Sequence, residues 1–322
     1  MLKTLVLAAS ALMLAAIAPA SQAQAWPERP IRLLVGFPPG GSTDLAARIL
    51  GNQLSQSLGQ TVIVENRAGA SGNIASEAVS RAAPDGYTLL MAATSFAAAP
   101  AFFDKLTWDP VKDFTPVSLV ATVPIMVVTT PALNIHTLKD LVAYSKQNPG
   151  KVNMASPGPT TLVRLSGEQF AQTAGLQWLT VHYKGGAPAM QDMLAGRGQV
   201  MFANISDVIA QVNGGKLDAI AVATPKRTAI APDVPTIAES GYPGFSFSTW
   251  QAVVGPAGMP PAVVARLNAE IHKAMALPEI QKQFLKLGTD ASTGTPEELR
   301  TLLVEEVAKI KRVAKATHAT SN

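Results

Sequence analysis

The chain has 322 residues, of which 48% are hydrophobic and only 15% are charged, a composition that excludes an intrinsically disordered protein. The formal net charge is +4, and the basic residues are dispersed, so the sequence lacks the basic and aromatic stripe that binds nucleic acid. The chain contains no cysteine, which excludes disulfides and thiolate metal sites. Its length fits two domains better than one.

The first 25 residues have the pattern of a secretory signal peptide. Lys3 precedes an apolar run over residues 5–17, and Ala23-Gln24-Ala25 supplies the small residues of a cleavage site before Trp26. The run is shorter than the roughly 20 apolar residues that span a bilayer, and no cysteine follows it that could carry a lipid. We therefore expect residues 1–25 to be removed and a soluble protein to be exported.

Strand-like and helix-like patterns alternate from residue 31 onward, which is typical of an α/β fold. The first unit is predicted to have strands at 31–37, 62–65 and 87–92 and helices that begin near residues 43 and 72. A second unit is predicted to have strands at 117–129, 152–155, 179–183, 200–203 and 217–223, a helix at 137–147 and further helical stretches. A strand at 245–254 then leads to helices at 260–275, 279–287 and 296–315, and the last helix has an apolar face that suits docking onto a domain.

The junction between the first strand and its helix is a glycine loop. Free N–H groups at a helix start, together with the positive end of the helix dipole, favour a carboxylate or phosphate, and glycine lets a ligand approach the backbone. The candidate ligand-binding residues here are Phe37, Gly40, Gly41, Ser42, Thr43 and Asp44.

A second junction of this kind follows the strand at 179–183. Pro188 suits the first turn of a helix, and Lys184 adds a positive charge. Its candidates are Tyr183, Lys184, Gly185, Gly186 and Ala187. Two such anion loops suggest a binding cleft between the two units.

Polar residues after other strands are further candidates, because ligands of parallel sheets bind beyond the carboxyl ends of the strands. Each has an alternative structural role. The threonines and Asn204 could cap helices, and Arg164 could form a surface ion pair instead of pairing with a carboxylate. This set comprises Thr94, Ser95, Gly158, Thr160, Thr161, Arg164, Asn204 and Asp207.

Signatures of enzymes and cofactors are missing from the sequence. The four histidines are not spaced as zinc ligands, and no nucleophile elbow, phosphate-binding loop or dinucleotide fingerprint occurs. We therefore predict no metal, no cofactor and no catalytic residues.

Six motifs, in this order, resemble the substrate-binding receptors of tripartite tricarboxylate transporters, known as the Bug family. They cover the whole chain after the signal region: GFPPGGSTD (36–44), VENRAG (64–69), APDGYTL (83–89), DPVKDF (109–114), YKGGAPA (183–189) and PDVPT (232–236).

The resemblance implies a monomeric, two-lobed periplasmic binding protein of the Venus flytrap type. Each lobe is then a mainly parallel sheet flanked by helices, with residues 26–125 and 248–322 in lobe 1 and residues 126–247 in lobe 2. It implies a hinge near 123–129 and 247–251. It also implies that the loops 37–44 and 183–187 grip one carboxylate, largely through backbone amides and bridging waters, and that the protein delivers it to a membrane permease with a large and a small subunit.

The sequence departs from the family pattern where the ligand would be recognised. Members often carry Gly-Thr-Ser-Ser-His in the region of Thr160 to Arg164, and an Asp often precedes the position of Asn204, where this chain has Ala203. A lost carboxylate and a gained guanidinium favour a more anionic ligand over one with an ammonium group. We therefore expect a di- or tricarboxylate, or a hydrophobic or aromatic acid, rather than an amino acid.

Two other functions remain open at the level of sequence. A co-receptor for a membrane sensor kinase would bind the same ligand and differ only in its partner. A periplasmic enzyme would need a base and a nucleophile that converge in the cleft, and no spacing in the sequence indicates them.

Overall fold

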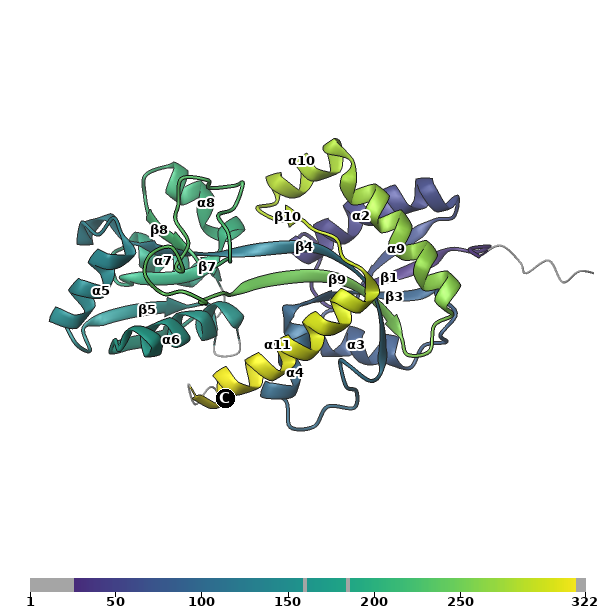
Figure 1. Cartoon of the computed structure of the whole chain (residues 1–322), viewed down its shortest axis with the longest axis horizontal. Coiled ribbons are helices and arrows are strands. Elements are labelled where there is room, and N and C mark those ends of the chain that lie inside the picture. Colours follow the sequence, from purple (N-terminus) through teal and green to yellow (C-terminus); the bar gives the residue numbers. More distant parts are fainter. Residues whose placement is uncertain (1–25, 159–160, 184–185, 317–322) are drawn as a thin grey trace, which may run out of the picture.

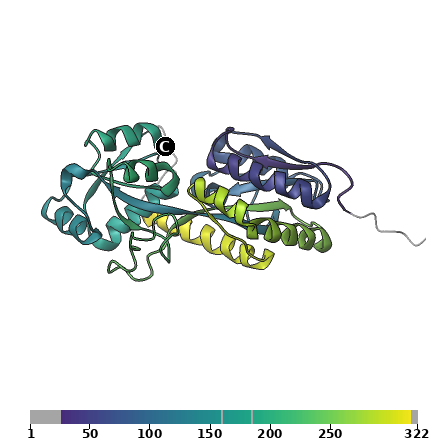
Figure 2. The same ribbon diagram turned by 90° about the horizontal axis from the view of Figure 1, so that it is seen from above.

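A computed structural model describes residues 26–158, 161–183 and 186–316, which form two α/β lobes joined end to end (Figures 1 and 2). The predicted signal peptide, residues 1–25, lies outside the described residues. The elements are β1 (Ile31–Val35), α2 (Ser42–Leu58), β2 (Val62–Asn66), η1 (Ala70–Gly72), α3 (Asn73–Ser80), β3 (Thr88–Ala93), α4 (Thr94–Phe102), β4 (Phe114–Thr129), η2 (Pro131–Leu133), α5 (Leu138–Gln147), β5 (Val152–Ser156), α6 (Leu162–Ala174), β6 (Trp178–His182), α7 (Gly186–Leu194), β7 (Val200–Asn204), α8 (Ile205–Asn213), β8 (Asp218–Val222), β9 (Ser248–Pro256), α9 (Pro261–Ala276), α10 (Pro278–Lys286), β10 (Asp290–Ala291) and α11 (Pro296–Ala316).

Lobe 1 is built on a sheet with the strand order β2-β1-β3-β9-β4. The strands β1, β2 and β3 are parallel, whereas β9 is antiparallel to both of its neighbours, β3 and β4. Apolar residues of α2, α9 and α10 pack on one face of this sheet, and those of α3, α4 and α11 pack on the other. The lobe therefore has three layers, with one hydrophobic cluster on each side of the sheet.

Lobe 2 repeats this plan with the strand order β6-β5-β7-β4-β8. The strands β5, β6 and β7 are parallel, and β4 is antiparallel to its neighbours β7 and β8. Residues of α7 and α8 pack on one face, and residues of α5 and α6 pack on the other. The expected α/β class with two lobes is confirmed. The sheets are mixed rather than mainly parallel, because β9 in lobe 1 and β4 in both lobes pair antiparallel with their neighbours.

The long strand β4 belongs to both lobes. Its residues up to Pro124 pair with β9, and from Ile125 onward it pairs with β7, so it changes partner between these two residues. The chain returns at Phe247, whose N–H still bonds to Ala223 of lobe 2, and enters β9 at Ser248. The predicted division at residues 125/126 and 247/248 lies next to these points and stays a prediction.

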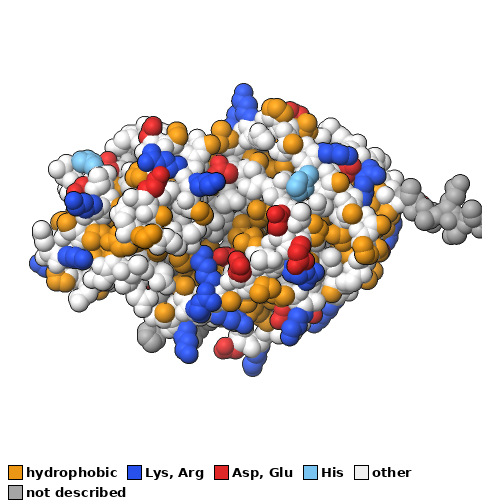
Figure 3. Space-filling view, in the orientation of Figure 1, with side chains coloured by type: hydrophobic (Ala, Val, Ile, Leu, Met, Phe, Trp, Pro, Cys, Tyr) orange, Lys and Arg blue, Asp and Glu red, His pale blue; other side chains and the backbone are white. Residues whose placement is uncertain are grey.

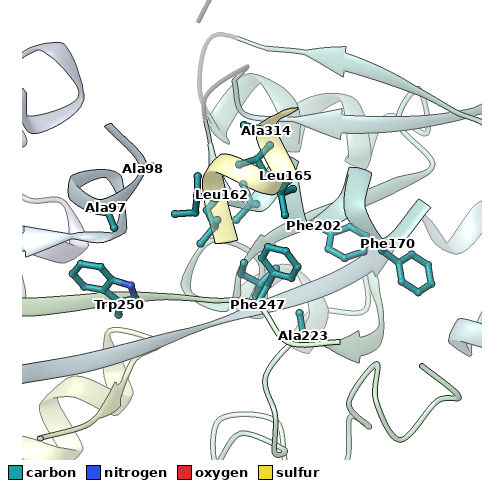
Figure 4. Packing of buried hydrophobic residues seen from close by; sticks show 14 of the residues in the cluster. Ala97, Ala98, Leu162, Leu165, Phe170, Phe202, Ala223, Phe247, Trp250 and Ala314 are labelled. Atoms are coloured by element: carbon teal, nitrogen blue, oxygen red, sulfur yellow. The ribbon is translucent and has the colours of Figure 1, made fainter. Parts of the chain in front are cut away.

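The C-terminal helix α11 ties the lobes together on one side. It packs on α4 and β4 of lobe 1 and also contacts α6 of lobe 2. Ala314, near its end, lies beside Leu165 of α6 in Figure 4. Lys309 bonds through Nζ to the carbonyl of Ser246 at 2.9 Å and lies over the ring of Phe247. The apolar face predicted from the sequence therefore docks onto the body of the protein.

Several elements differ from the sequence prediction, and two of these differences have a clear physical reason. The strand predicted at 245–254 begins at Ser248, because Phe245 and Phe247 lie in a turn segment and pack into an aromatic cluster with Phe170 of α6. The helix α4 was not predicted, because it is apolar on all sides and so lacks an amphipathic period. No helix in the described part of the chain is long and apolar enough to cross a membrane.

Gly36, at the end of β1, is required by close packing. A Cβ atom built there would lie 2.6 Å from the Cα atom of Gly72, which is backbone and cannot rotate away. We predict that Gly36→Ala lowers the free energy of unfolding by about 1–3 kcal/mol, measured by urea denaturation. Gly41→Ala, in the same loop, is the control for stability, because its Cβ would meet nothing closer than 3.7 Å. Equal stability of the two variants would contradict this packing argument.

Candidate functional site

A cavity of about 750 Å³ lies between the lobes. Lobe 1 contributes the end of β1, the starts of α2 and α4 and the middle of β9, and lobe 2 contributes the starts of α6, α7 and α8. The lining residues are Phe37, Pro38, Pro39, Gly41, Ser42, Thr43, Ser71, Ala93, Thr94, Ser95, Ala98, Ala99, Phe102, Phe103, Val123, Pro157, Thr161, Leu162, Val163, Gly186, Met201, Ala203, Asn204, Asp207, Thr249, Trp250 and Gln251.

The starts of five helices meet at this cavity within the described residues. The helices α2, α4, α6, α7 and α8 each follow a strand directly, and the first residues of each line the cavity. Parallel strands end at one edge of a sheet, so the following helices all present their N-termini there. The cap residues Gly41, Ala93 and Asn204 make no side-chain capping hydrogen bond. First-turn N–H groups of α2, α4 and α8 are therefore available to a ligand.

Charged side chains contribute little to this wall. Among the described lining residues there is no Lys, Arg or His, and Asp207 is the one acidic residue. On the face of the molecule in Figure 3, charged groups of both signs are interspersed over the surface. The attraction for an anion therefore comes from backbone N–H groups and helix dipoles. No group of His, Asp and Glu residues in the described ranges could hold a metal ion.

Asp44 fixes the shape of the glycine loop and does not line the cavity. Its side chain is buried, and Oδ2 accepts hydrogen bonds from the Gly40 N–H at 2.8 Å and from Arg48 at 3.0 Å. Oδ1 accepts from Asn66 at 2.8 Å, and Asn66 also donates to the carbonyl of Phe37. The expectation that Asp44 contacts the ligand is corrected, because its carboxylate is occupied in holding the loop.

These bonds also determine the ionisation of Asp44. Burial raises the pKa of the carboxyl, but hydrogen bonds from Arg48, Gly40 and Asn66 outweigh burial and hold the pKa below its usual value of 3.8. Asp44 is therefore ionised at neutral pH, and its charge is neutralised by Arg48 beside it. Gly40, at φ 85°, does not line the cavity and serves the same turn.

Thr94 and Ser95, at the start of α4, both line the cavity. The Thr94 hydroxyl is already engaged, since it accepts a hydrogen bond from the backbone N–H of Trp250 at 2.7 Å. It therefore joins α4 to β9 and offers the ligand less than expected. Ser95 is half-buried beside it at the cavity wall.

At the start of α6, Thr161 lines the cavity and also caps the helix. Its Oγ1 accepts from the Arg164 N–H and donates to the carbonyl of Gly158 at 3.0 Å. Gly158 itself does not line the cavity. Thr160 lies outside the described residues.

Arg164, expected to lean toward the cavity mouth, is not among the residues that line the cavity. Its side chain is buried, and its Nε lies 2.8 Å from Glu168, one turn further along α6. The i, i+4 ion pair anticipated as its alternative role is what forms, although inside the lobe. The preference for a more anionic ligand that was inferred from this guanidinium therefore stays a prediction.

In the loop before α7, Gly186 lines the cavity, while Tyr183 is turned away from it. The Tyr183 hydroxyl donates to Asp192 at 2.5 Å, and burial together with this bond raises the pKa of Tyr183 to about 12. Lys184 and Gly185 lie outside the described residues, as does the side chain of Ala187.

Asn204 and Asp207, at the start of α8, both line the cavity. Oδ1 of Asn204 accepts from the Thr249 hydroxyl at 3.1 Å, which links lobe 2 to β9. Asp207 is open to solvent in the cleft, but the protein atoms around it desolvate its carboxyl and raise the pKa above 3.8.

Sequence reasoning missed the apolar part of the wall and the residues of β9. Phe102 was not singled out, Leu162 and Val163 were noted only as apolar residues in the region where the ligand would be recognised, and Trp250 and Gln251 were placed only in the predicted hinge. No local sequence pattern identifies these residues as a group, because only the fold brings them to the cavity wall.

The role assigned to Asp44 predicts a pH-dependent effect on stability. Asp44→Asn removes a charged acceptor of three hydrogen bonds, and we expect it to lower the free energy of unfolding at pH 7 by about 1–3 kcal/mol. Because the native pKa lies below 3.8, the contribution is fully present above that pH and is lost as the pH falls further. Urea denaturation of both proteins should therefore show a constant difference from pH 7 to pH 5 that narrows below pH 3.8.

The control for this prediction is Asp85→Asn, which breaks an exposed ion pair with Arg29. This substitution should lower the free energy of unfolding by less than about 0.5 kcal/mol. An equal effect of the two substitutions would contradict the structural role of Asp44.

Comparisons with known proteins agree with this architecture. The sequence model of the family described as "Tripartite tricarboxylate transporter family receptor" matches residues 46–318. Protein BugT of Bordetella pertussis is 36% identical over 307 residues, which is 95% of this chain and 94% of BugT. The R. palustris protein Rpa4515, solved with adipate, is 31% identical with a TM-score of 0.79, covering 92% of this chain and 99% of its own.

A third similar protein is MatC of Rhodopseudomonas palustris, solved with bound malate. It is 30% identical with a TM-score of 0.73, and the match covers 89% of this chain and 99% of MatC. The family consists of receptors, so an enzyme, one of the alternatives left open by the sequence, is not supported. The chain belongs to the family of tripartite tricarboxylate transporter receptors, the Bug family of solute-binding proteins.

Proposed function

We propose that this protein is a periplasmic receptor that binds a small carboxylate between its lobes and delivers it to a tripartite membrane permease. The observation that carries the proposal is the convergence of five helix N-termini on one cavity whose described wall has no cationic side chain. Such a wall favours an anion of modest charge through N–H groups.

The carboxylate is proposed to lie at the start of α2, against Gly41, Ser42 and Thr43. Asp44 holds Gly40 and the loop in place before the ligand binds. Binding therefore loses little conformational entropy in ordering the loop. The loop 183–187 is proposed to close on the carboxylate from lobe 2, with Gly186 at the cavity wall. Bridging waters can complete such a grip at little loss of enthalpy.

Similar proteins support a carboxylate as the ligand, since one was solved with adipate and another with malate. Here Ala203, Leu162 and Val163 give the lobe 2 wall an apolar character. An acid with an apolar body suits this wall better than an amino acid, whose ammonium group would find one acidic partner, Asp207, among the described lining residues.

Closure is proposed to occur where the connecting strands pass between the lobes. The partner change of β4 at Pro124 and Ile125 and the entry into β9 at Ser248 concentrate the connection in a few residues. Export by the predicted signal peptide would place this movement in the periplasm, where the permease could receive the ligand. The delivery step predicts that cells that lack the protein lose uptake of the bound acid, which an uptake assay would measure.

A charge placed at the start of α2 tests the binding site. A thermal-shift screen with adipate, malate, hexanoate and benzoate at about millimolar concentration should first identify a ligand, since about 100 times Kd adds about 2.7 kcal/mol of stability. We predict that Ser42→Asp weakens binding of that acid about 100-fold in calorimetry, because like charges then meet. An acidic first turn stabilises a helix, so the fold should be retained.

The control is Asn52→Asp, which adds the same charge on the exposed side of α2, away from the cavity. It should bind as the wild type does. Unchanged binding by Ser42→Asp would place the ligand elsewhere, and the absence of any response to every acid would overturn the carboxylate receptor.

Closure of the lobes gives a separate prediction. The radius of gyration of the protein, measured by small-angle X-ray scattering, should decrease when the identified acid is added at saturating concentration, because the lobes approach across the cavity. Ser42→Asp at the same acid concentration should keep the larger value. A radius that does not change in the wild type would show that binding occurs without lobe closure.

A further inference from the structure

Among the described residues of the cavity wall, Trp250 and Gln251 each have a buried side-chain polar atom without a hydrogen-bond partner. These atoms are Nε1 of Trp250 and Oε1 of Gln251, and the two residues are 3% and 2% exposed. Buried polar groups in native proteins are nearly always paired, and each exception needs a reason. A ligand that is bound only some of the time is one such reason, and both residues line the cavity.

The two groups serve different ends of the cavity. Successive side chains of a strand point to opposite faces. Trp250 packs in the cluster that contains α4, whereas Val253, which lies on the same face as Gln251, packs in the cluster that contains α2. Gln251 therefore lies toward the carboxylate end at α2, and Trp250 lies toward the end formed by α4 and α6.

The Trp250 end of the cavity is apolar on both sides. Ala98 and Phe102 of α4 form the lobe 1 side, and Leu162 and Val163 of α6 form the lobe 2 side. In Figure 4 the nitrogen-bearing edge of the Trp250 indole is directed toward Leu162, across the space between the two helices. The indole N–H is thus a buried, unpaired donor next to apolar side chains.

We propose that Trp250 is a specificity-determining residue that donates its indole N–H to an uncharged oxygen at the distal end of the bound acid. The proposal rests on the proposed function, because it takes the carboxylate at α2 as given. The ligand class is then a monocarboxylate with an apolar body and a distal keto, ether or hydroxyl oxygen.

Charge in the wall argues against a second carboxylate at this end. The described lining residues include no cation, and Asp207 adds a negative charge. A distal carboxylate would lose its hydration there, and the indole N–H is the one buried side-chain donor without a partner among the described lining residues. A bond to that donor does not compensate an ion in an apolar setting. A neutral oxygen needs only that one bond. In this respect the chain would differ from its relatives that were solved with adipate and malate.

Three acids with a six-carbon chain test the proposal by calorimetry: hexanoate, 5-oxohexanoate and adipate. They share one carboxylate and differ at the distal end, which carries no oxygen, a neutral oxygen or a second charge. In the wild type, 5-oxohexanoate should bind about tenfold tighter than hexanoate, the size expected for one buried hydrogen bond. It should also bind tighter than adipate.

Substitution of Trp250 locates this preference. Trp250→Phe keeps an aromatic ring and removes the N–H, so the affinity for 5-oxohexanoate should fall to that for hexanoate while hexanoate itself changes less than about twofold. The matched control is Trp108→Phe, a buried tryptophan of the same lobe that stacks on Phe96 and does not line the cavity. It should keep the preference.

Several results would overturn the proposal and leave the receptor function standing. These are equal wild-type affinities for hexanoate and 5-oxohexanoate, tighter binding of adipate, an equal loss for both monocarboxylates in Trp250→Phe, or binding of shorter acids alone. The wild-type comparison decides even if the variant fails to fold. By contrast, no binding of any carboxylate would refute the proposed function itself.

Discussion

This structure depends on one constraint. Parallel strands of both lobes end at one cavity, and the next element after each of these strands is a helix. They bring the N-termini of α2, α4 and α8, whose first residues make no side-chain caps, to one space between the lobes. The proposed anion site is thus a consequence of topology, and no cationic side chain is among its described lining residues. An N–H wall without strong charge can hold a carboxylate and release it, as a receptor must.

The rest of the site keeps this wall in place. Buried Asp44, exposed Arg48 and half-buried Asn66 form a hydrogen-bonded network that fixes the glycine loop. A carboxylate so close to an anion site would repel the ligand if it were unpaired, and its bonds to Arg48 and Asn66 prevent that. Two hydrogen bonds connect β9 to both lobes. The Thr94 hydroxyl of lobe 1 accepts from the backbone N–H of Trp250, and Oδ1 of Asn204 in lobe 2 accepts from the Thr249 hydroxyl. The same strand therefore forms part of the wall and connects the lobes.

Much of this architecture could be predicted from sequence, because glycine loops and strand-to-helix junctions are local patterns. The starts of α2 and α7 were identified in this way. The roles of individual side chains could not be predicted where a partner distant in sequence decides them, as Asn66 does for Asp44. Arg164 is a different case, because its partner Glu168 is one helical turn away and the pair could have been read directly. The apolar wall at Leu162 and Val163 has no local signature, since only the fold shows that it faces a cavity.

The central claim is that backbone N–H groups at helix starts hold the carboxylate, and nuclear magnetic resonance tests it directly. In ¹⁵N-labelled, deuterated protein titrated with the acid found by thermal shift, the largest amide shift changes should fall on Gly41, Ser42 and Thr43 and at the starts of α6, α7 and α8. Changes of this size confined to the surface near Lys309 and α11, with the amides of α2 unmoved, would contradict the account.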